Sequence, residues 1–218
     1  MGKRAIITGS SGLIGSKLLN ILLESREYDT VISLARKRLQ KRHPKLVQEI
    51  INFDEPDTYL SFINGDVLFC CLGTTQKQTP NKDDYYKIDH DCPVDLAKSA
   101  LKNNVQEFHF VSAIGADPSS SNFYLKTKGE AERDLKEIGL ASLHIYEPSL
   151  LTGRKRKRRI GERIATVVMK IINPLLMGGL KKYQSIDGAI VAKAMFNQSL
   201  KDKKGVFVYT TERIKKRA

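Results

Sequence analysis

A glycine-rich turn near the amino terminus is the feature that most constrains the fold of this chain. Gly9, Gly12 and Gly15 stand three residues apart and directly follow the apolar run at residues 5–7. Leucines with helical spacing continue the chain after the turn. A strand, a tight turn and a helix in this order place backbone N–H groups at a helix N-terminus, where the helix dipole favours a pyrophosphate. The segment therefore predicts a nucleotide-binding βα unit.

Apolar β-type segments alternate with helical segments along the rest of the chain. Strands are predicted at 4–8, 31–35, 67–72, 106–112, 141–146 and 205–210, with a weaker one near 49–53, and helices at 13–25, 84–103, 122–138 and 186–200. Such alternation is typical of an α/β protein. The expected fold is a single-domain Rossmann fold over residues 1–218, in which helices cover both faces of a doubly wound parallel sheet.

The stretch at residues 150–182 interrupts this alternation, because it is first basic and then amphipathic. Ligands of open α/β sheets bind beyond the carboxyl ends of the strands. An insertion at this point can form a substrate wall or a lid, and an ordinary pair of surface helices fits the pattern equally well. Substrate specificity is expected to depend on this region. The sequence identifies neither the substrate nor the oligomeric state.

The composition, with 41% hydrophobic residues and a net charge of +13, is that of a globular protein. No apolar run reaches the roughly 20 residues that span a bilayer, and the first strand begins too early for a signal peptide. The three cysteines and four histidines show no metal-binding spacing. No metal site is expected, and a reducing, cytoplasmic location is predicted. His109 and His144, both in predicted strands, are interpreted as hydrogen-bonded core residues.

Three basic clusters contribute much of the positive charge, at residues 36–42, 154–159 and 213–217. A surface for nucleic acid or an anionic membrane is one interpretation. We favour a solvated surface that attracts anionic cofactors, because aromatic side chains are not interleaved with the cations. The run at 154–159 is expected to form a mobile, solvated loop at the rim of a substrate cleft.

Two basic residues follow the second predicted strand. In dinucleotide-binding units, an acidic residue about 20 residues beyond the glycines accepts hydrogen bonds from the adenosine ribose of NAD. Arg36 and Lys37 stand at this position instead, and a guanidinium can hold a ribose phosphate through two hydrogen bonds. The pattern favours NADP(H) over NAD(H). The alternative is that Arg36 simply begins a solvated basic helix.

A tyrosine and a lysine lie four residues apart on one face of the predicted helix at 122–138. These residues are Tyr124 and Lys128, and Ser112 ends the preceding predicted strand. A neighbouring ammonium lowers the pKa of a phenol from its usual value near 10. Tyr124 can then exchange a proton with a substrate oxygen that Ser112 holds. The three residues are the candidate catalytic group for hydride transfer to or from a small carbonyl or alcohol.

Together these motifs resemble the short-chain dehydrogenase/reductase superfamily, in particular an atypical branch of small oxidoreductases related to the Tat-interacting protein. The glycine spacing and the segments at 71–75, 110–117 and 124–130 carry the resemblance, which extends over nearly the whole chain. It implies an NAD(P)-binding oxidoreductase that acts on a small molecule. One departure concerns Glu147-Pro148-Ser149, where such proteins usually have Arg-Pro-Gly, and it leaves the substrate contacts open.

The resemblance also implies which residues contact the cofactor. Expected contacts with the pyrophosphate come from Gly9, Ser11, Gly12, Leu13, Ile14 and Gly15, those with the adenosine phosphate from Arg36 and Lys37, and those with adenine from Phe53 and Asp54. The nicotinamide-side ribose is expected at Leu72, Gly73, Thr74 and Lys128, and the nicotinamide at Pro148, Ser149 and Leu150. Because proteins of this branch often keep the cofactor site with weak or undefined turnover, a non-catalytic NADP(H)-binding module is the alternative function. A nucleic-acid-binding protein that has kept only the Rossmann fold is a third.

Overall fold

A seven-stranded parallel sheet forms the centre of the molecule, in the strand order β3-β2-β1-β4-β5-β6-β9. The computed structural model describes residues 2–153 and 184–218 of the chain. The strands are β1 (Lys3–Thr8), β2 (Tyr28–Ala35), β3 (Leu46–Ile50), β4 (Val67–Cys70), β5 (Glu107–Val111), β6 (Ser142–Glu147) and β9 (Gly205–Thr210). The sequence order reverses between β1 and β4, as in a doubly wound Rossmann sheet. The predicted α/β fold is thus confirmed.

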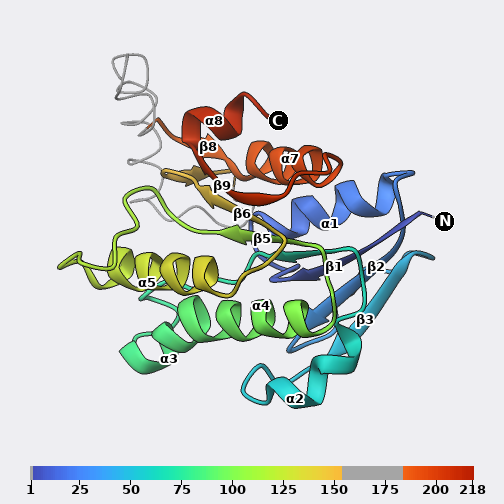
Figure 1. Ribbon diagram of the computed structural model, residues 1–218, viewed down its shortest axis with the longest axis horizontal. Helices are drawn as coiled ribbons and strands as arrows, with labels where there is room; N and C mark the ends of the chain where they lie inside the picture. The colour runs from blue at the N-terminus through green and yellow to red at the C-terminus, as the bar shows by residue number, and fades with distance from the viewer. Residues whose placement is uncertain (1, 154–183) are drawn as a thin grey trace.

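Helices cover both faces of this sheet (Figure 1). One face carries α1 (Gly15–Glu24), α7 (Gly188–Ser199) and α8 (Thr211–Lys215), and the other carries α4 (Cys92–Lys102) and α5 (Phe123–Glu137), with α2 (Pro56–Tyr59) and α3 (Lys82–Tyr86) on the same side. Successive residues of β1 point to opposite faces of the sheet. Ile6 packs in the hydrophobic core on the side of α4, and Ile7 packs in the core on the side of α1. Burial on both faces explains why the strands are continuous apolar runs.

The predicted helix at 84–103 consists of three segments. Between α3 and α4, residues Lys87–Asp91 form a π-helical turn, η2. This widened turn directs Asp89 and His90 inward, where they are 1% and 7% exposed. A periodicity of 3.6 residues cannot show such a turn, so the sequence predicted one uninterrupted helix.

Other differences concern short elements at the ends of longer ones. The weak strand expected near 49–53 is β3 at 46–50, and α2, the 3-10 turn η1 (Leu60–Phe62) and α8 were not predicted. A small parallel pair, β7 (Leu151–Thr152) and β8 (Ile186–Asp187), brackets the region at 150–182. The basic run 154–159 and most of that region lie outside the described residues. In the described part of the chain, none of the helices has the length and apolar character that a membrane span requires.

Candidate functional site

The predicted site segments meet at the carboxyl edge of the sheet. Strands β1, β2, β4, β5 and β6 all run in the same direction. The residues that follow them therefore lie along one edge, which is where open α/β sheets bind ligands (Figure 1). These residues are 9–15, 36–37, 72–74, 112 and 148–150, and α5 adds Tyr124 and Lys128.

The glycine turn between β1 and α1 lies close against its neighbours. Gly9 has a φ of +69°, and a Cβ on this residue would overlap the carbonyl oxygen of Cys71. A Cβ on Gly15 would in turn overlap the carbonyl oxygen of Gly9. Ser11 and Gly12 stay exposed at the outside of the turn, whereas Ile14 is buried behind them and Leu13 is half-buried. The arrangement leaves open backbone at the N-terminus of α1, which fits a pyrophosphate.

The two basic residues predicted to select the cofactor follow β2 directly. Arg36 and Lys37 are exposed, and neither has an ion-pair partner among the residues that the structure describes. Ser33, just before them on β2, bonds Ser10 of the glycine turn, with 2.7 Å between the two Oγ atoms. This bond holds β2 beside the glycine turn, and Arg36 and Lys37 follow Ser33 three and four residues later.

The two residues predicted to flank adenine differ in exposure. The Phe53 ring is buried and packs at a tilt against Tyr59, with ring centroids 6.1 Å apart. Asp54 is exposed and forms a 2.8 Å ion pair with Lys87. A cavity of about 280 Å³ opens beside Phe53 and Asp54, but its lining continues along α4 and does not include Tyr124 or Lys128. We therefore do not assign it to the substrate.

A buried ion pair holds the lysine of the candidate catalytic group. Lys128 Nζ lies 2.9 Å from Asp89 Oδ1, and the two side chains are 4% and 1% exposed. The same ammonium donates to the Val111 carbonyl oxygen at 3.3 Å and lies 4.8 Å from the centre of the Phe110 ring. Burial lowers the pKa of Lys128, but attraction to Asp89 and Tyr124 outweighs it and raises the pKa above its ordinary value. Lys128 is thus a fixed positive charge.

Asp89 is a site residue that the sequence analysis missed. Its Oδ2 accepts a hydrogen bond from the Thr74 backbone N–H at 2.9 Å, so it joins the segment expected at the nicotinamide-side ribose to Lys128. One signal in the sequence was available. With Tyr85, Cys92 and Leu96, Asp89 occupies an otherwise apolar stripe of the predicted helix, and a buried carboxylate requires a partner.

Tyr124 stands at the open side of this ion pair. It remains 40% exposed, and its ring meets the Tyr85 ring edge-on with centroids 6.5 Å apart. Partial burial raises the pKa of Tyr124, the charge of Lys128 lowers it, and the charge of Asp89 raises it again, with a net rise above the ordinary value near 10. The phenol is accordingly protonated at neutral pH.

Ser112 has a partner other than a substrate. It is 3% exposed, and its hydroxyl donates to Glu132 Oε1 on α5 at 2.6 Å. A hydroxyl that donates its only proton to a carboxylate can still accept a hydrogen bond. In this rotamer Ser112 can accept from a substrate alcohol, but it cannot donate to a substrate carbonyl.

The segment after β6 is anchored on both sides. The Pro148 carbonyl oxygen accepts from the Ile114 N–H at 3.0 Å, and the Ser149 N–H donates to Thr211 Oγ1 at 2.9 Å. The Ser149 hydroxyl donates to the Gln184 carbonyl oxygen. Leu150 is 47% exposed, so its side chain is the apolar surface that this segment offers at the sheet edge.

The parallel sheet and the glycine turn between β1 and α1 define a Rossmann-fold protein of the dinucleotide-binding class. The chain belongs to the NAD dependent epimerase/dehydratase family, whose family model matches residues 5–137. It is 31% identical to "Protein FMP52, mitochondrial" of Coccidioides immitis over 91% of this chain and 86% of that protein. With "Protein HTATIP2" of Rattus norvegicus it shares 32% identity over 75% of this chain and 69% of that protein.

Two solved structures show the same fold at low sequence identity. The Bordetella bronchiseptica enzyme WbmH in complex with NAD⁺ superposes with a TM-score of 0.73 at 16% identity, covering 97% of this chain and 76% of that one. A UDP-N-acetylglucosamine 4-epimerase from Methanobrevibacter ruminantium gives a TM-score of 0.70 at 17% identity, covering 96% and 76%. The family relationship predicted from the motifs is confirmed. The predicted cytoplasmic location is not, since one of these relatives is named as mitochondrial.

Proposed function

We propose that this protein is an NADP(H)-dependent oxidoreductase that transfers a hydride between the nicotinamide and a small carbonyl or alcohol. One observation carries the proposal. Tyr124 is exposed and lies one helical turn before the buried Lys128, at the edge of the sheet where ligands bind. Family membership supports a nicotinamide cofactor. The preference for NADP(H) rests on Arg36 and Lys37, and the cytoplasmic location remains part of the proposal.

The glycine turn fits such a cofactor, because Gly9 and Gly15 allow a backbone approach too close for any side chain, and Ser11 and Gly12 leave exposed backbone at the N-terminus of α1. The pyrophosphate is assigned to residues 9–15, the adenosine phosphate to Arg36 and Lys37, adenine to Phe53 and Asp54, the second ribose to Leu72, Gly73, Thr74 and Lys128, and the nicotinamide to Pro148, Ser149 and Leu150. When bound, the nicotinamide supplies hydride chemistry. The protein's own residues must then move a proton to or from the substrate oxygen.

Tyr124 is suited to the acid role. Its raised pKa keeps the phenol protonated at neutral pH, so it can donate a proton to a carbonyl oxygen as the hydride arrives. Lys128 stabilises the phenolate that forms, because its ammonium is held in place by Asp89. We therefore assign carbonyl reduction as the favoured direction at neutral pH. A screen of aldehydes, ketones and quinones that follows NADPH absorbance tests this assignment, and enzyme-dependent consumption of NADPH is the expected result.

The pH dependence of the reverse reaction is expected to change in Asp89→Asn. Alcohol oxidation needs the Tyr124 phenolate, and Asp89 raises the pKa of Tyr124. Removing this charge should therefore shift the rising limb of the oxidation profile to lower pH. The measurement is kcat against pH at saturating alcohol, with Asp91→Asn as a control because Asp91 bonds His90 instead, at 2.8 Å. An identical profile in wild type and Asp89→Asn contradicts this role of Tyr124 and Asp89.

Ser112→Ala is expected to reduce carbonyl reduction less than 10-fold, a smaller loss than removal of the Tyr124 hydroxyl. The reason is that Ser112 donates to Glu132 in this structure and has no proton to offer a carbonyl. Steady-state kinetics of the variant check the expectation. A loss of about 100-fold or more, with cofactor binding intact, would show that the hydroxyl turns toward the substrate during the reaction.

The alternative is a module that binds NADP(H) without turnover and reports redox state to a partner. The observation that favours it is the pairing of Lys128 with Asp89, because a neutralised ammonium lowers the pKa of a phenol less than a free one does. This function predicts NADPH binding with no consumption in the same screen.

A further inference from the structure

Strand β9 forms one outer edge of the seven-stranded sheet, because it is last in the strand order and pairs with β6. The Gly205 N–H donates to the Ala141 carbonyl oxygen at 2.9 Å, so residues 205, 207 and 209 direct their backbone groups toward β6. Val206 and Val208 therefore direct theirs outward, where no further strand of the described residues lies. An edge of this kind is a template for a strand from another chain.

Arg213 of α8 confirms the outward direction of these backbone groups. It donates to the Val208 carbonyl oxygen at 3.3 Å from the side away from β6. The Val206 N–H, the Val206 C=O and the Val208 N–H have no partner among the described residues. The Val206 side chain is 49% exposed and Gly205 is exposed beside it, so this part of the edge is open to solvent.

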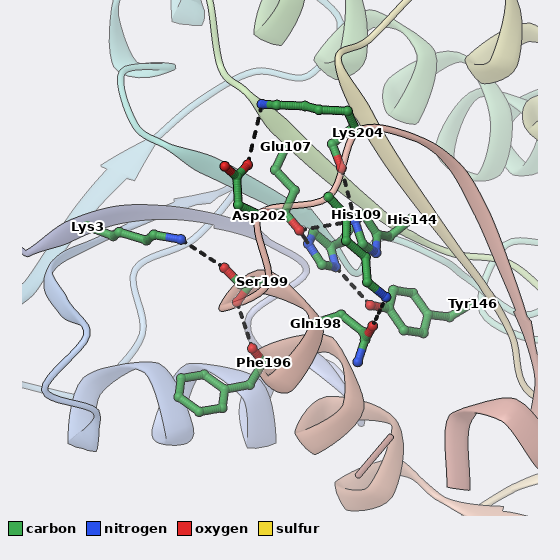
Figure 2. A network of polar contacts seen from close by, with 12 residues as sticks. Lys3, Glu107, His109, His144, Tyr146, Phe196, Gln198, Ser199, Asp202 and Lys204 are labelled. Carbon is green, nitrogen blue, oxygen red and sulfur yellow. Dashed lines mark hydrogen bonds and ion pairs between the residues drawn. The ribbon is translucent and has the colours of Figure 1, made fainter. Parts of the chain in front are cut away.

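The segment that contains this edge is strongly basic. Positions 201–217 hold seven lysines and arginines and two acidic residues. Figure 2 shows Lys204, which directly precedes β9, turned to Asp202, with 3.7 Å between the charged atoms. Both side chains are mostly exposed, and an exposed ion pair of this kind contributes little free energy. Lys204 can therefore exchange Asp202 for a carboxylate of another chain at little cost.

The charges and rings around β9 limit which kind of partner fits this edge. A second copy of the chain would bring the same excess of positive charge to the contact, and like charges oppose edge-to-edge pairing. Nucleic-acid bases stack on free aromatic faces. Here the Lys203 ammonium lies over the Phe207 ring, 5.2 Å from its centre, and the Arg217 guanidinium lies over the Tyr209 ring at 4.9 Å. An extended acidic peptide matches both the open backbone groups and the charge.

We propose that the outer edge of β9 binds an acidic, extended segment of a partner protein by β-strand addition. The backbone of that segment bonds the outward groups of Val206 and Val208, which supplies affinity without a fixed sequence. Its carboxylates lie beside Lys204 and Arg213, and a guanidinium can hold a carboxylate through two hydrogen bonds. Residues 205–210 are not assigned to the cofactor, so the proposal does not rest on the proposed oxidoreductase.

Binding is tested with a fluorescent peptide of about seven alternating glutamates and valines, titrated with the full chain and followed by fluorescence anisotropy. The expected Kd lies below about 100 µM, and replacing the glutamates by lysines should abolish binding. Lys204→Glu should weaken binding by at least about 10-fold. Lys41→Glu is the matched control, because Lys41 is exposed beside β3 at the opposite edge of the sheet, and it should change affinity by less than about 3-fold.

The backbone contact is tested with Val206→Pro, which removes one outward N–H. Proline is tolerated on an edge strand where the N–H faces solvent, so the melting temperature should stay within about 3 °C of wild type. Peptide affinity should fall by at least about 10-fold. If the variant does not fold, a probe with N-methylated amides removes the same hydrogen bonds from the peptide side, and it should not bind the wild type.

Amide hydrogen exchange of the wild type reads the contact directly. The peptide should slow exchange at Val206 and Val208 and leave Phe207 and Tyr209 unchanged, because the latter two already donate to β6. Absence of binding below about 100 µM, binding without this alternation, or equal binding of the N-methylated probe would each overturn the proposal. So would self-association that Val206→Pro abolishes, which assigns the edge to a second copy, or single-stranded DNA that binds more tightly than the peptide and is lost in Lys204→Glu.

Discussion

NADPH is expected to bind this protein about 10- to 150-fold more tightly than NADH. This ratio corresponds to roughly 1.5–3 kcal/mol for a charge-assisted contact with the 2′-phosphate. Arg36 and Lys37 are exposed at the end of β2 without ion-pair partners among the described residues, so the phosphate need not displace an acid to reach them. Fluorescence or calorimetric titration of both cofactors into wild type and Arg36→Ala measures the effect, and the variant should lose most of the preference.

A matched control separates a specific contact from the general positive charge of the protein. Arg42→Ala removes the same charge from the same basic cluster, at an exposed residue farther along the chain from the end of β2. It should leave the ratio of NADPH to NADH affinity nearly unchanged. Equal affinity of the wild type for the two cofactors would refute the assignment of Arg36 and Lys37, as would an equal loss of preference in both variants.

Tyr124→Phe is expected to lower any measured carbonyl reduction by at least about 100-fold while NADPH affinity stays unchanged. The substitution removes only the phenolic hydroxyl group, and the ring can still pack edge-on against Tyr85. Tyr86→Phe is the control, because it removes another phenol of the same region whose ring stacks on His90 instead, with centroids 4.5 Å apart. Reduction that survives Tyr124→Phe unchanged would place the proton donor elsewhere.

Lys128→Ala should impair both reduction and cofactor binding, since Lys128 is assigned to the ribose and to the phenol. The substitution leaves the buried Asp89 carboxylate without its ion-pair partner, a change that typically destabilises a protein by about 3–5 kcal/mol. Thermal unfolding must therefore accompany the kinetics. The double variant Asp89→Asn/Lys128→Met removes both charges and should recover stability without recovering activity. Recovered activity would show that Lys128 acts only through the fold.

Much of the fold could be predicted from the hydrophobic periodicity and the residues that end the helices. The elements that were missed depend on contacts between segments that lie far apart in the sequence. Strands buried on both faces are short apolar runs. The start of α5 is marked by Asn122, whose side chain accepts a hydrogen bond from the Leu125 N–H at 3.1 Å, and its end by Gly139, which has a φ of +81°. Such signals lie within a few residues of each other. The π-helical turn at Lys87–Asp91 has no comparable signal, and its contacts are with α5, which lies far away in the sequence.

The candidate site likewise contains residues that the sequence predicts and residues that only the structure identifies. The glycine turn, Arg36 and the Tyr124–Lys128 pair are recognisable from spacing, because their geometry is set by one strand–turn–helix unit or by one helical turn. Asp89 was not, because its partner Lys128 comes from another helix. Ser112 was identified by position, but its hydrogen bond to Glu132 was not, because the partner lies 20 residues further along the chain, on α5.

The sequence by itself determined the fold class and the order of the site segments along the chain, because hydrophobic period and turn chemistry are local properties. Only the tertiary structure decided which distant side chains share a charge or a proton. The Asp89–Lys128 ion pair and the Ser112–Glu132 hydrogen bond join residues that have no fixed spacing in sequence. Strand register and the widened helical turn bring them together, and burial then makes each of these pairings obligatory, since an unpaired charge in the core is costly.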